Sequence, residues 1–269
     1  MEKTFATLGL TTLALTTPAP HVMVITMNRP AAMNAMNTRM MEDLRDCFAQ
    51  FYIEADRARC LVLTGAGDKA FCAGADLKER NGMTDAIWRR QHAIVEQTIR
   101  AMLDCPVPVI AAVNGAAYAG GCELALACDF IYAAEHARFA QTEVALGIIP
   151  GAMGTQNLPR AVGVRRAKEV ILSGAPFSAA DALEWGLANR VLPGPELMGE
   201  VLKIAARIAA NAPVAVRQAK KSIDKSTDLD RSNGYSYEIE AYNRTVGTQD
   251  RLEGIRAFNE KRKPDFKGQ

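Results

Sequence analysis

The sequence predicts an α/β fold in which buried strands alternate with amphipathic helices, followed by a region of helices alone. Three apolar runs rich in β-branched residues have the length of buried strands: Val22–Met27, Cys60–Thr64 and Val109–Val113. Segments whose apolar residues recur at helical spacing separate these runs. Such an alternation is typical of a sheet with mostly parallel pairing.

The helices between the strands have recognisable starts and ends. The first strand ends at Asn28-Arg29-Pro30, and Asn37 then offers an N-cap to a helix that extends through Phe51. After the second strand, a longer amphipathic helix carries Trp88 and ends before Cys105-Pro106. These boundaries place one helix between each pair of predicted strands.

The strand pattern continues to a short run at Phe130–Ala133, and after about Pro195 only helical patterns follow. No Gly/Ser-rich linker divides the two parts, so we expect an α/β core over residues 1–195 and a helical C-terminal extension over 196–269. The predicted helices of the extension are Glu196–Asn211, Pro213–Ser226, Leu229–Thr248 and Arg251–Lys261.

Composition gives no reason to expect nucleic acid or an acidic membrane surface as a partner, because the 269 residues carry a net charge of only +2. Six cysteines lie mostly in apolar runs without CxxC spacing, which indicates reduced core residues of a cytoplasmic protein. The three scattered histidines do not form a metal-binding pattern, and we expect no metal.

Membrane insertion and secretion are also disfavoured. No apolar run reaches the length that spans a bilayer, so we expect no membrane segment. Phe5–Leu15 has some character of a signal peptide, but Glu2 lies in the n-region and threonines interrupt the apolar part.

The most informative stretch begins with the predicted strand Val109–Val113. Asn114-Gly115 ends this strand, and Gly120-Gly121 opens an apolar helix, which leaves backbone N–H groups free at the helix start. Such donors stabilise an oxygen that becomes negative during a reaction. Glu123 lies within this apolar helix, where a buried carboxylate is costly unless it is paired or used. The alternative is a surface-facing glutamate on a less buried helix.

A second loop of small residues, Ala73–Leu77, also follows a strand. Two such loops each contribute one backbone donor in a two-donor oxyanion hole, although close helix–strand packing explains either loop alone. Just before it, Gly65–Ala70 fits the permissive dinucleotide fingerprint. The residues that follow, Phe71–Asp76, favour a turn over the helix that this fingerprint requires, so the nicotinamide reading is disfavoured.

Glu143 is a second candidate acid, at the head of an apolar segment that ends in a Pro150-Gly151 turn. Buried carboxylates with raised pKa values are a usual means of moving protons near neutral pH. Two carboxylates that face two oxyanion donors suit enolate chemistry next to a carbonyl group. The residues themselves do not name the carbonyl compound.

Three motifs follow one another along the chain: Phe71–Lys78, Ala119–Ala125 and Gln141–Gly151. Together they resemble the enoyl-CoA hydratase (crotonase) family, and the resemblance covers nearly the whole chain. It implies a spiral of ββα units with a helical C-terminal region that builds homotrimers, often paired as hexamers.

By this resemblance, the backbone N–H groups of Ala75 and Gly120 form the oxyanion hole for a thioester oxygen. Glu123 and Glu143 match the two hydratase glutamates, which hold a water between them. Glu123 then orients and activates the water, Glu143 protonates the α-carbon, and the N–H of Gly151 faces the water.

The resemblance also implies an acyl-CoA thioester as substrate, with coenzyme A as part of that substrate and no separate cofactor. Phe258 and Lys261 match residues of the last helix that touch CoA bound in a neighbouring subunit. The positions that wrap the CoA within one subunit match Met33, Ala35, Ala73, Ala75, Asp76, Leu77 and Gly120.

Three positions depart from the family pattern. Ala119 replaces the first of three usual glycines, Met153 stands where a glycine is common, and Asn157 replaces a frequent arginine. Met153 either narrows the acyl pocket or fills a gap in the core. These changes affect the expected acyl chain more than the expected reaction.

Three functions follow from the residues and the resemblance. The favoured one is hydration of a trans-2-enoyl-CoA, because both glutamates are present. The second is another reaction of the superfamily, such as isomerisation, decarboxylation, thioester hydrolysis, or hydration of a branched substrate such as 3-methylglutaconyl-CoA. The stretch ending in Lys78-Glu79-Arg80 resembles that branched-substrate branch. The third is a non-catalytic scaffold or an RNA binder, which the near-neutral charge disfavours.

Overall fold

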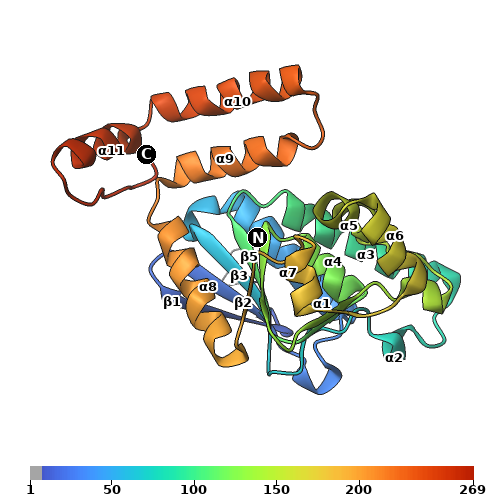
Figure 1. Ribbon diagram of the computed structural model, residues 1–269. Helices are drawn as coiled ribbons and strands as arrows, with labels where there is room; N and C mark the ends of the chain where they lie inside the picture. The colour runs from blue at the N-terminus through green and yellow to red at the C-terminus, as the bar shows by residue number, and fades with distance from the viewer. Residues whose placement is uncertain (1–7) are drawn as a thin grey trace.

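Residues 8–269 are described by a computed structural model, and their strands form two sheets (Figure 1). The larger sheet has six strands in the order β1-β2-β3-β5-β7-β10. β1 is antiparallel to β2, and the later neighbours pair in parallel. The three strands predicted from apolar runs are its β2, β3 and β5. The strands of this sheet are β1 (Leu13–Ala19), β2 (Val22–Met27), β3 (Cys60–Gly65), β5 (Val109–Val113), β7 (Phe130–Ala134) and β10 (Arg190–Leu192).

The smaller sheet has the order β4-β6-β8-β9, with parallel pairing except between β8 and β9. Consecutive strands alternate between the sheets: β3, β5 and β7 join the larger sheet, and β4, β6 and β8 join the smaller one. This alternation, with helices between the pairs, confirms the predicted spiral of ββα units. The strands of the smaller sheet are β4 (Ala70–Cys72), β6 (Ala116–Tyr118), β8 (Arg138–Ala140) and β9 (Phe177–Ser178).

Helices lie around the two sheets (Figure 1). Asn37 caps the first of them as predicted, because its Oδ1 accepts a hydrogen bond of 3.0 Å from the backbone N–H of Met40. The α-helices are α1 (Thr38–Ile53), α2 (Leu77–Arg80), α3 (Asp85–Leu103), α4 (Gly120–Leu126), α5 (Gly154–Val162), α6 (Val164–Ser173), α7 (Ala179–Glu184), α8 (Gly194–Ala209), α9 (Pro213–Lys225), α10 (Arg231–Val246) and α11 (Gln249–Asn259). Among residues 8–269, the 3-10 helices are η2 (Pro30–Ala32), η3 (Ala55–Arg57) and η4 (Glu143–Leu146).

Helix α8 packs on the larger sheet, and its inward residues Leu197, Val201 and Ala205 are buried. The helices that stand away from the two sheets therefore begin at α9. Figure 1 shows α9 and α10 side by side above the body of the protein, with α11 at the left edge. The division at residues 195 and 196 remains a prediction.

All six cysteines are buried and carry free thiols, in agreement with their expected place in a reduced core. Of Phe5–Leu15, residues 5–7 lie outside the described part of the chain, and Leu13 begins β1. Within residues 8–269, no helix has the length and apolar character needed to cross a membrane. The same residues contain no group of three His, Cys, Asp or Glu side chains placed to hold a metal ion.

Ala119, which connects β6 to α4, has an unusual backbone conformation with φ +50° and ψ −124°. L-residues with a side chain rarely adopt this region, whereas glycine enters it freely. Two hydrogen bonds hold it there, from its N–H to the carbonyl of Ala140 (2.8 Å) and from the N–H of Glu123 to its carbonyl (3.1 Å). This backbone conformation explains why the family pattern has a glycine at position 119.

Replacing Ala119 with glycine should stabilise the protein. Relief of about 1–3 kcal/mol of backbone strain exceeds the roughly 0.5–1 kcal/mol that glycine costs through chain entropy. We expect Ala119→Gly to raise the free energy of unfolding in urea by about 1 kcal/mol. Ala117→Gly, the same change at a buried residue of β6, is the control and should destabilise. Equal destabilisation by the two variants would show that position 119 is not strained.

Candidate active site

A cavity of about 520 Å³ lies between the first half of α3, the loop after β4, the start of α4 and the segment from Thr142 to Ala152. The five residues predicted to be catalytic all line it, although they come from three separate stretches of the chain. They are Ala75, Gly120, Glu123, Glu143 and Gly151.

The loop after β4 is held against the segment that precedes α1. The N–H of Met36 donates to the carbonyl of Gly74 (2.8 Å), and the N–H of Asp76 donates to the carbonyl of Met36 (2.9 Å). These bonds form a short parallel bridge that fixes Ala75 between them. Within residues 8–269, the N–H of Ala75 has no hydrogen-bond acceptor, so this donor is available to a ligand in the cavity.

The start of α4 lies next to the same loop. Gly74 has φ +95°, and a Cβ at this position would lie 2.9 Å from the carbonyl oxygen of Tyr118. Gly121 is equally constrained, because a Cβ there would overlap the backbone of Cys72. Glycine is thus required for the two loops to approach each other. Gly120 is the first residue of α4, and among the described residues its N–H also has no acceptor.

Glu123 is buried in α4, as predicted, with only 3% of its surface exposed. Its Oε1 accepts hydrogen bonds from the backbone N–H groups of Ala152 (2.7 Å) and Gly154 (2.8 Å). Burial and the nearby charge of Glu143 raise the pKa of Glu123 to about 7, although the two N–H donors act in the opposite direction. This carboxyl group therefore has a fixed orientation and exchanges its proton near neutral pH.

Glu143 begins η4 and is also buried, with 5% of its surface exposed. Its Oε2 has no hydrogen-bond partner among residues 8–269. Burial raises the pKa of Glu143 above its usual value. A buried carboxyl oxygen without a partner is costly in a resting structure, and this one lies at the cavity wall.

Gly151 lies close to the ring of His92, a residue that sequence analysis did not single out. A Cβ on Gly151 would lie 2.5 Å from Cε1 of His92, so any larger residue here would require the imidazole to move. Within the described part of the chain, the N–H of Gly151 has no backbone acceptor. A lone histidine in an amphipathic helix gave no signal of this contact.

The predicted CoA-binding residues divide into two groups. Ala73 and Leu77 line the cavity, whereas Met33, Ala35 and Asp76 lie outside its lining. Met33 is 42% exposed on the turn after η2. The cavity therefore brings together only part of the predicted CoA-binding set, and the binding role of these residues stays a prediction.

Arg29, which sequence analysis did not single out, connects the segment before α1 with the loop after β4. Its guanidinium donates to the carbonyl of Ala35 and forms an ion pair of 2.9 Å with Asp76. Asp76 in turn accepts hydrogen bonds from the N–H groups of Lys78 (3.1 Å) and Glu79 (3.4 Å) and caps α2. The desolvation of Asp76 raises its pKa, but the bonds from Arg29 and the two amides outweigh it, so the pKa lies below the usual value.

Phe258 and Lys261 do not reach the cavity of their own chain. Phe258 lies on α11 with 83% of its surface exposed, and Lys261 follows the end of that helix. In Figure 1, α11 is at the left edge, whereas α2 is at the lower right. Any contact of these residues with CoA therefore requires a neighbouring subunit.

Met153 lies outside the lining of this cavity and outside the core. The interpretation that it fills a gap in the core is therefore wrong, whereas its effect on an acyl pocket stays a prediction. Met153 is 39% exposed and lines a separate cavity of about 840 Å³ together with Asn157. Its φ of +73° places it in the left-handed region immediately before α5. Glycine is common at such a position because of this backbone conformation.

Comparisons with known proteins agree with this geometry. Residues 19–269 match the family model described as enoyl-CoA hydratase/isomerase. The crotonyl-CoA hydratase of Syntrophomonas wolfei is 41% identical over 244 residues, which are 90% of this chain and 93% of that protein. The short-chain-enoyl-CoA hydratase of Clostridium acetobutylicum is 40% identical over 242 residues, 90% of this chain and 92% of that protein.

A solved structure is similar over almost the whole chain. The enoyl-CoA hydratase of Bacillus anthracis superimposes with a TM-score of 0.94 at 46% identity, covering 96% of this chain and 100% of that one. The likeness in fold therefore extends over both sheets and the C-terminal helices. This chain belongs to the enoyl-CoA hydratase/isomerase family.

Proposed function

We propose that this protein hydrates a trans-2-enoyl-CoA to a 3-hydroxyacyl-CoA. The observation that carries the proposal is the meeting of two buried glutamates and two free backbone donors in one cavity. The relatives from Syntrophomonas wolfei and Clostridium acetobutylicum, named as hydratases of crotonyl-CoA and short-chain enoyl-CoA, support this choice.

The N–H groups of Ala75 and Gly120 are assigned to the thioester oxygen. Addition of water to the β-carbon moves negative charge onto this oxygen, and two fixed donors stabilise that charge without reorganising. Each such donor typically contributes about 10²–10³ in rate. The short bridge at Met36 and the close approach of Gly74 to α4 hold the donors in place.

Glu123 and Glu143 are assigned to the water and its protons. Since Glu123 is anchored through Oε1, its other oxygen accepts a proton from the water as the water oxygen bonds to the β-carbon. Glu143 donates a proton to the α-carbon, which its raised pKa favours. The elements of water have then been added across the double bond, and proton transfer from Glu123 to Glu143 restores the starting state. Gly151 directs its N–H at the water.

A branched enoyl-CoA is the second candidate substrate, because the same machinery hydrates it. The isomerase, decarboxylase and hydrolase reactions of the superfamily are less well supported, since many of those relatives lack one of the two acids. Loss of enoyl-thioester absorbance on adding crotonyl-CoA tests hydration directly. A panel of linear and branched enoyl-CoA esters then separates the substrate candidates.

The assembly and place of action belong to the same proposal. The exposed apolar residues of α10 and α11, including Ile239, Leu252, Ile255 and Phe258, suit a subunit interface in a trimer or hexamer. The CoA assignments of Met33, Ala35, Ala73, Asp76 and Leu77 also rest on the family pattern. We place the enzyme in the cytoplasm because its six buried thiols suit a reducing compartment.

The two glutamates can be tested by removing their charge at constant shape. Glu123→Gln and Glu143→Gln should each lower kcat for hydration by at least about 10²-fold, because each loses a positioned proton donor or acceptor. Binding of a saturated acyl-CoA should change little. The double variant should lose much less than the product of the single losses, since both groups act on one water. Glu135→Gln, at an exposed residue, is the control, and a single variant as active as this control would refute the assignment.

The raised pKa of Glu123 also predicts a pH dependence of stability. Because the pKa is 4.5 when unfolded and about 7 when folded, the folded state binds more protons between these values. The stabilisation is complete below pH 4.5 and is lost as the pH rises through 7, by up to roughly 3 kcal/mol. Urea unfolding from pH 4.5 to 8 should therefore show a steeper fall for the wild type than for Glu123→Gln. If stability falls equally with pH in the wild type and in Glu123→Gln, a group other than Glu123 causes the pH dependence.

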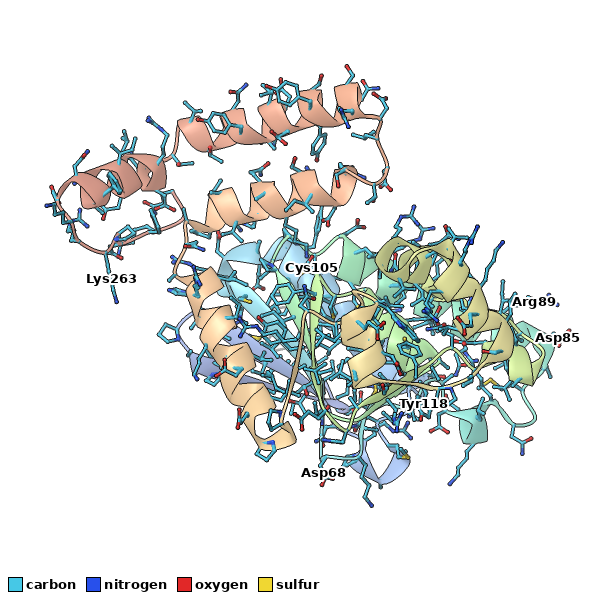
Figure 2. The ribbon with its side chains drawn as sticks, viewed as in Figure 1. Asp68, Asp85, Arg89, Cys105, Tyr118 and Lys263 are labelled. Atoms are coloured by element: carbon cyan, nitrogen blue, oxygen red, sulfur yellow. The ribbon has the colours of Figure 1, made fainter. Side chains whose placement is uncertain are left out.

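The role of the C-terminal helix predicts a change in binding without a change in chemistry. A cation next to a CoA phosphate acts equally on substrate and transition state, so Lys261→Ala should raise KM several-fold with little effect on kcat. The effect should be larger at low salt, where screening is weakest. Lys263→Ala removes another exposed cation, labelled in Figure 2, and serves as the control. Equal KM values for the two variants would argue against a CoA contact at Lys261.

A further inference from the structure

A buried amide side chain on α3 has no part in the mechanism above. Gln91 lies on the inward, mostly apolar face of this helix, with 3% of its surface exposed. It does not line the cavity of the proposed active site, although its neighbour His92 does. Because a buried amide is costly unless its donors and its acceptor find partners, the hydrogen bonds of Gln91 explain its place.

The amide of Gln91 joins α1, α2 and α3. Its Nε2 donates hydrogen bonds of 2.8 Å each to Oγ1 of Thr38, the first residue of α1, and to Oε2 of Glu79 in α2. Its Oε1 accepts a bond of 2.8 Å from Nε of Arg80, the last residue of α2. Oε2 of Glu79 also accepts the backbone N–H of Thr38 at 2.8 Å, which closes a ring of hydrogen bonds. Both amide protons of Gln91 are thus used.

Helix α2 follows directly on the loop that carries Ala75, whose N–H is assigned to the thioester oxygen. With four residues, α2 is too short to be stable as an isolated helix, and it lies at the edge of the molecule in Figure 1. Its position therefore depends on its attachments. The bridge at Met36 holds the loop before α2, and the hydrogen bonds of Gln91 hold α2 itself.

The next residue of α3 is attached to the opposite side of the site. The ring of His92 packs against Gly151, and the N–H of the following residue, Ala152, donates to Oε1 of Glu123 (2.7 Å). Adjacent residues of a helix project roughly 100° apart, so one turn of α3 contacts both sides. This turn connects the helix after the Ala75 loop with the segment that orients Glu123.

We propose that Gln91 is a positioning residue for hydration: through Glu79 and α2, it holds the N–H of Ala75 at the distance from the water site that the reaction requires. This inference rests on the proposed function and adds to it a residue outside the three motifs of the family resemblance. The donors and the acids act together on the transition state. An error in their separation therefore lowers kcat more than it weakens ground-state binding.

Gln91→Leu tests the proposal, because leucine has a similar volume, suits the apolar face and removes all three hydrogen bonds. Its kcat for crotonyl-CoA should fall by about 10- to 100-fold, the effect of a small misplacement of reacting groups, while KM changes much less. Thr98→Val is the matched control. Thr98 is 2% exposed on the same helix and donates to the carbonyl of Met41, so it also ties α3 to α1 but not to α2. This control should keep the wild-type kcat.

A spectroscopic measurement separates positioning from general structural support. Hydrogen bonds from the oxyanion donors lower the carbonyl stretching frequency of a bound thioester. Butyryl-CoA, which has no double bond to hydrate, can carry a ¹³C label at this carbonyl for infrared spectroscopy. The lowering of its frequency on binding should be smaller in Gln91→Leu than in the wild type or in Thr98→Val.

Exchange of the two side chains tests whether the hydrogen bonds themselves matter. In Gln91→Glu two carboxylates face each other, and kcat should fall. The double variant Glu79→Gln/Gln91→Glu again pairs an amide with a carboxylate and leaves Arg80 an acceptor, so it should recover most of this loss.

Two results would overturn the inference while hydration stands: a wild-type kcat in Gln91→Leu, or a lowered kcat with an unchanged carbonyl band. If Gln91→Leu does not fold, the exchange decides, and a double variant with wild-type thermal stability but a low kcat also overturns it. If the wild type hydrates no enoyl-CoA ester, the proposed function fails instead. The carbonyl band then decides whether Gln91 positions the donor at Ala75.

Discussion

The burial of two carboxyl groups in one cavity is the constraint on which the rest of this structure depends. Either group alone is costly in a low-dielectric environment, and together they oppose each other's ionisation. Two backbone N–H groups stabilise Glu123 through hydrogen bonds to its Oε1, whereas Oε2 of Glu143 has no partner among residues 8–269. Helix α4 and the segment from Thr142 to Gly154 must then stay in register, since a shift of either would separate Glu123 from its donors.

The spiral of two sheets supplies the second requirement, which is a pair of amides beside those acids. β4 and β6 are parallel neighbours in the smaller sheet, so the loops that follow them leave from the same edge. Gly74 and Gly121 allow the backbones to approach where any side chain would collide. The strained Ala119 turns the chain sharply into α4, so that the N–H of Gly120 points at the cavity instead of at another peptide. The arrangement of the two sheets thus also positions the two amides proposed as oxyanion donors.

The sequence predicted those features whose physical signal lies within a few neighbouring residues. The long strands β2, β3 and β5, the cap at Asn37 and the burial of Glu123 follow from local patterns. β4, β6 and β8 have three residues each and are too short for any periodicity to appear. The ion pair of Arg29 with Asp76 and the contact of His92 with Gly151 join residues far apart in the chain. Such contacts depend on the fold, which here came from the family resemblance and not from periodicity.

The hydrogen-bond partners of the buried carboxyl groups distinguish those that support the fold from those that face the cavity. Asp43 and Asp250 are each 2% exposed, as deeply buried as Glu123 and Glu143. Asp43 accepts from two backbone amides and a threonine hydroxyl, and Asp250 accepts from two backbone amides, so each carboxylate is satisfied within the fold. Glu143, by contrast, keeps an oxygen without a hydrogen-bond partner among residues 8–269. Because an unsatisfied buried group destabilises the resting protein, this oxygen at the cavity wall is explained when a substrate or its water provides the missing partner.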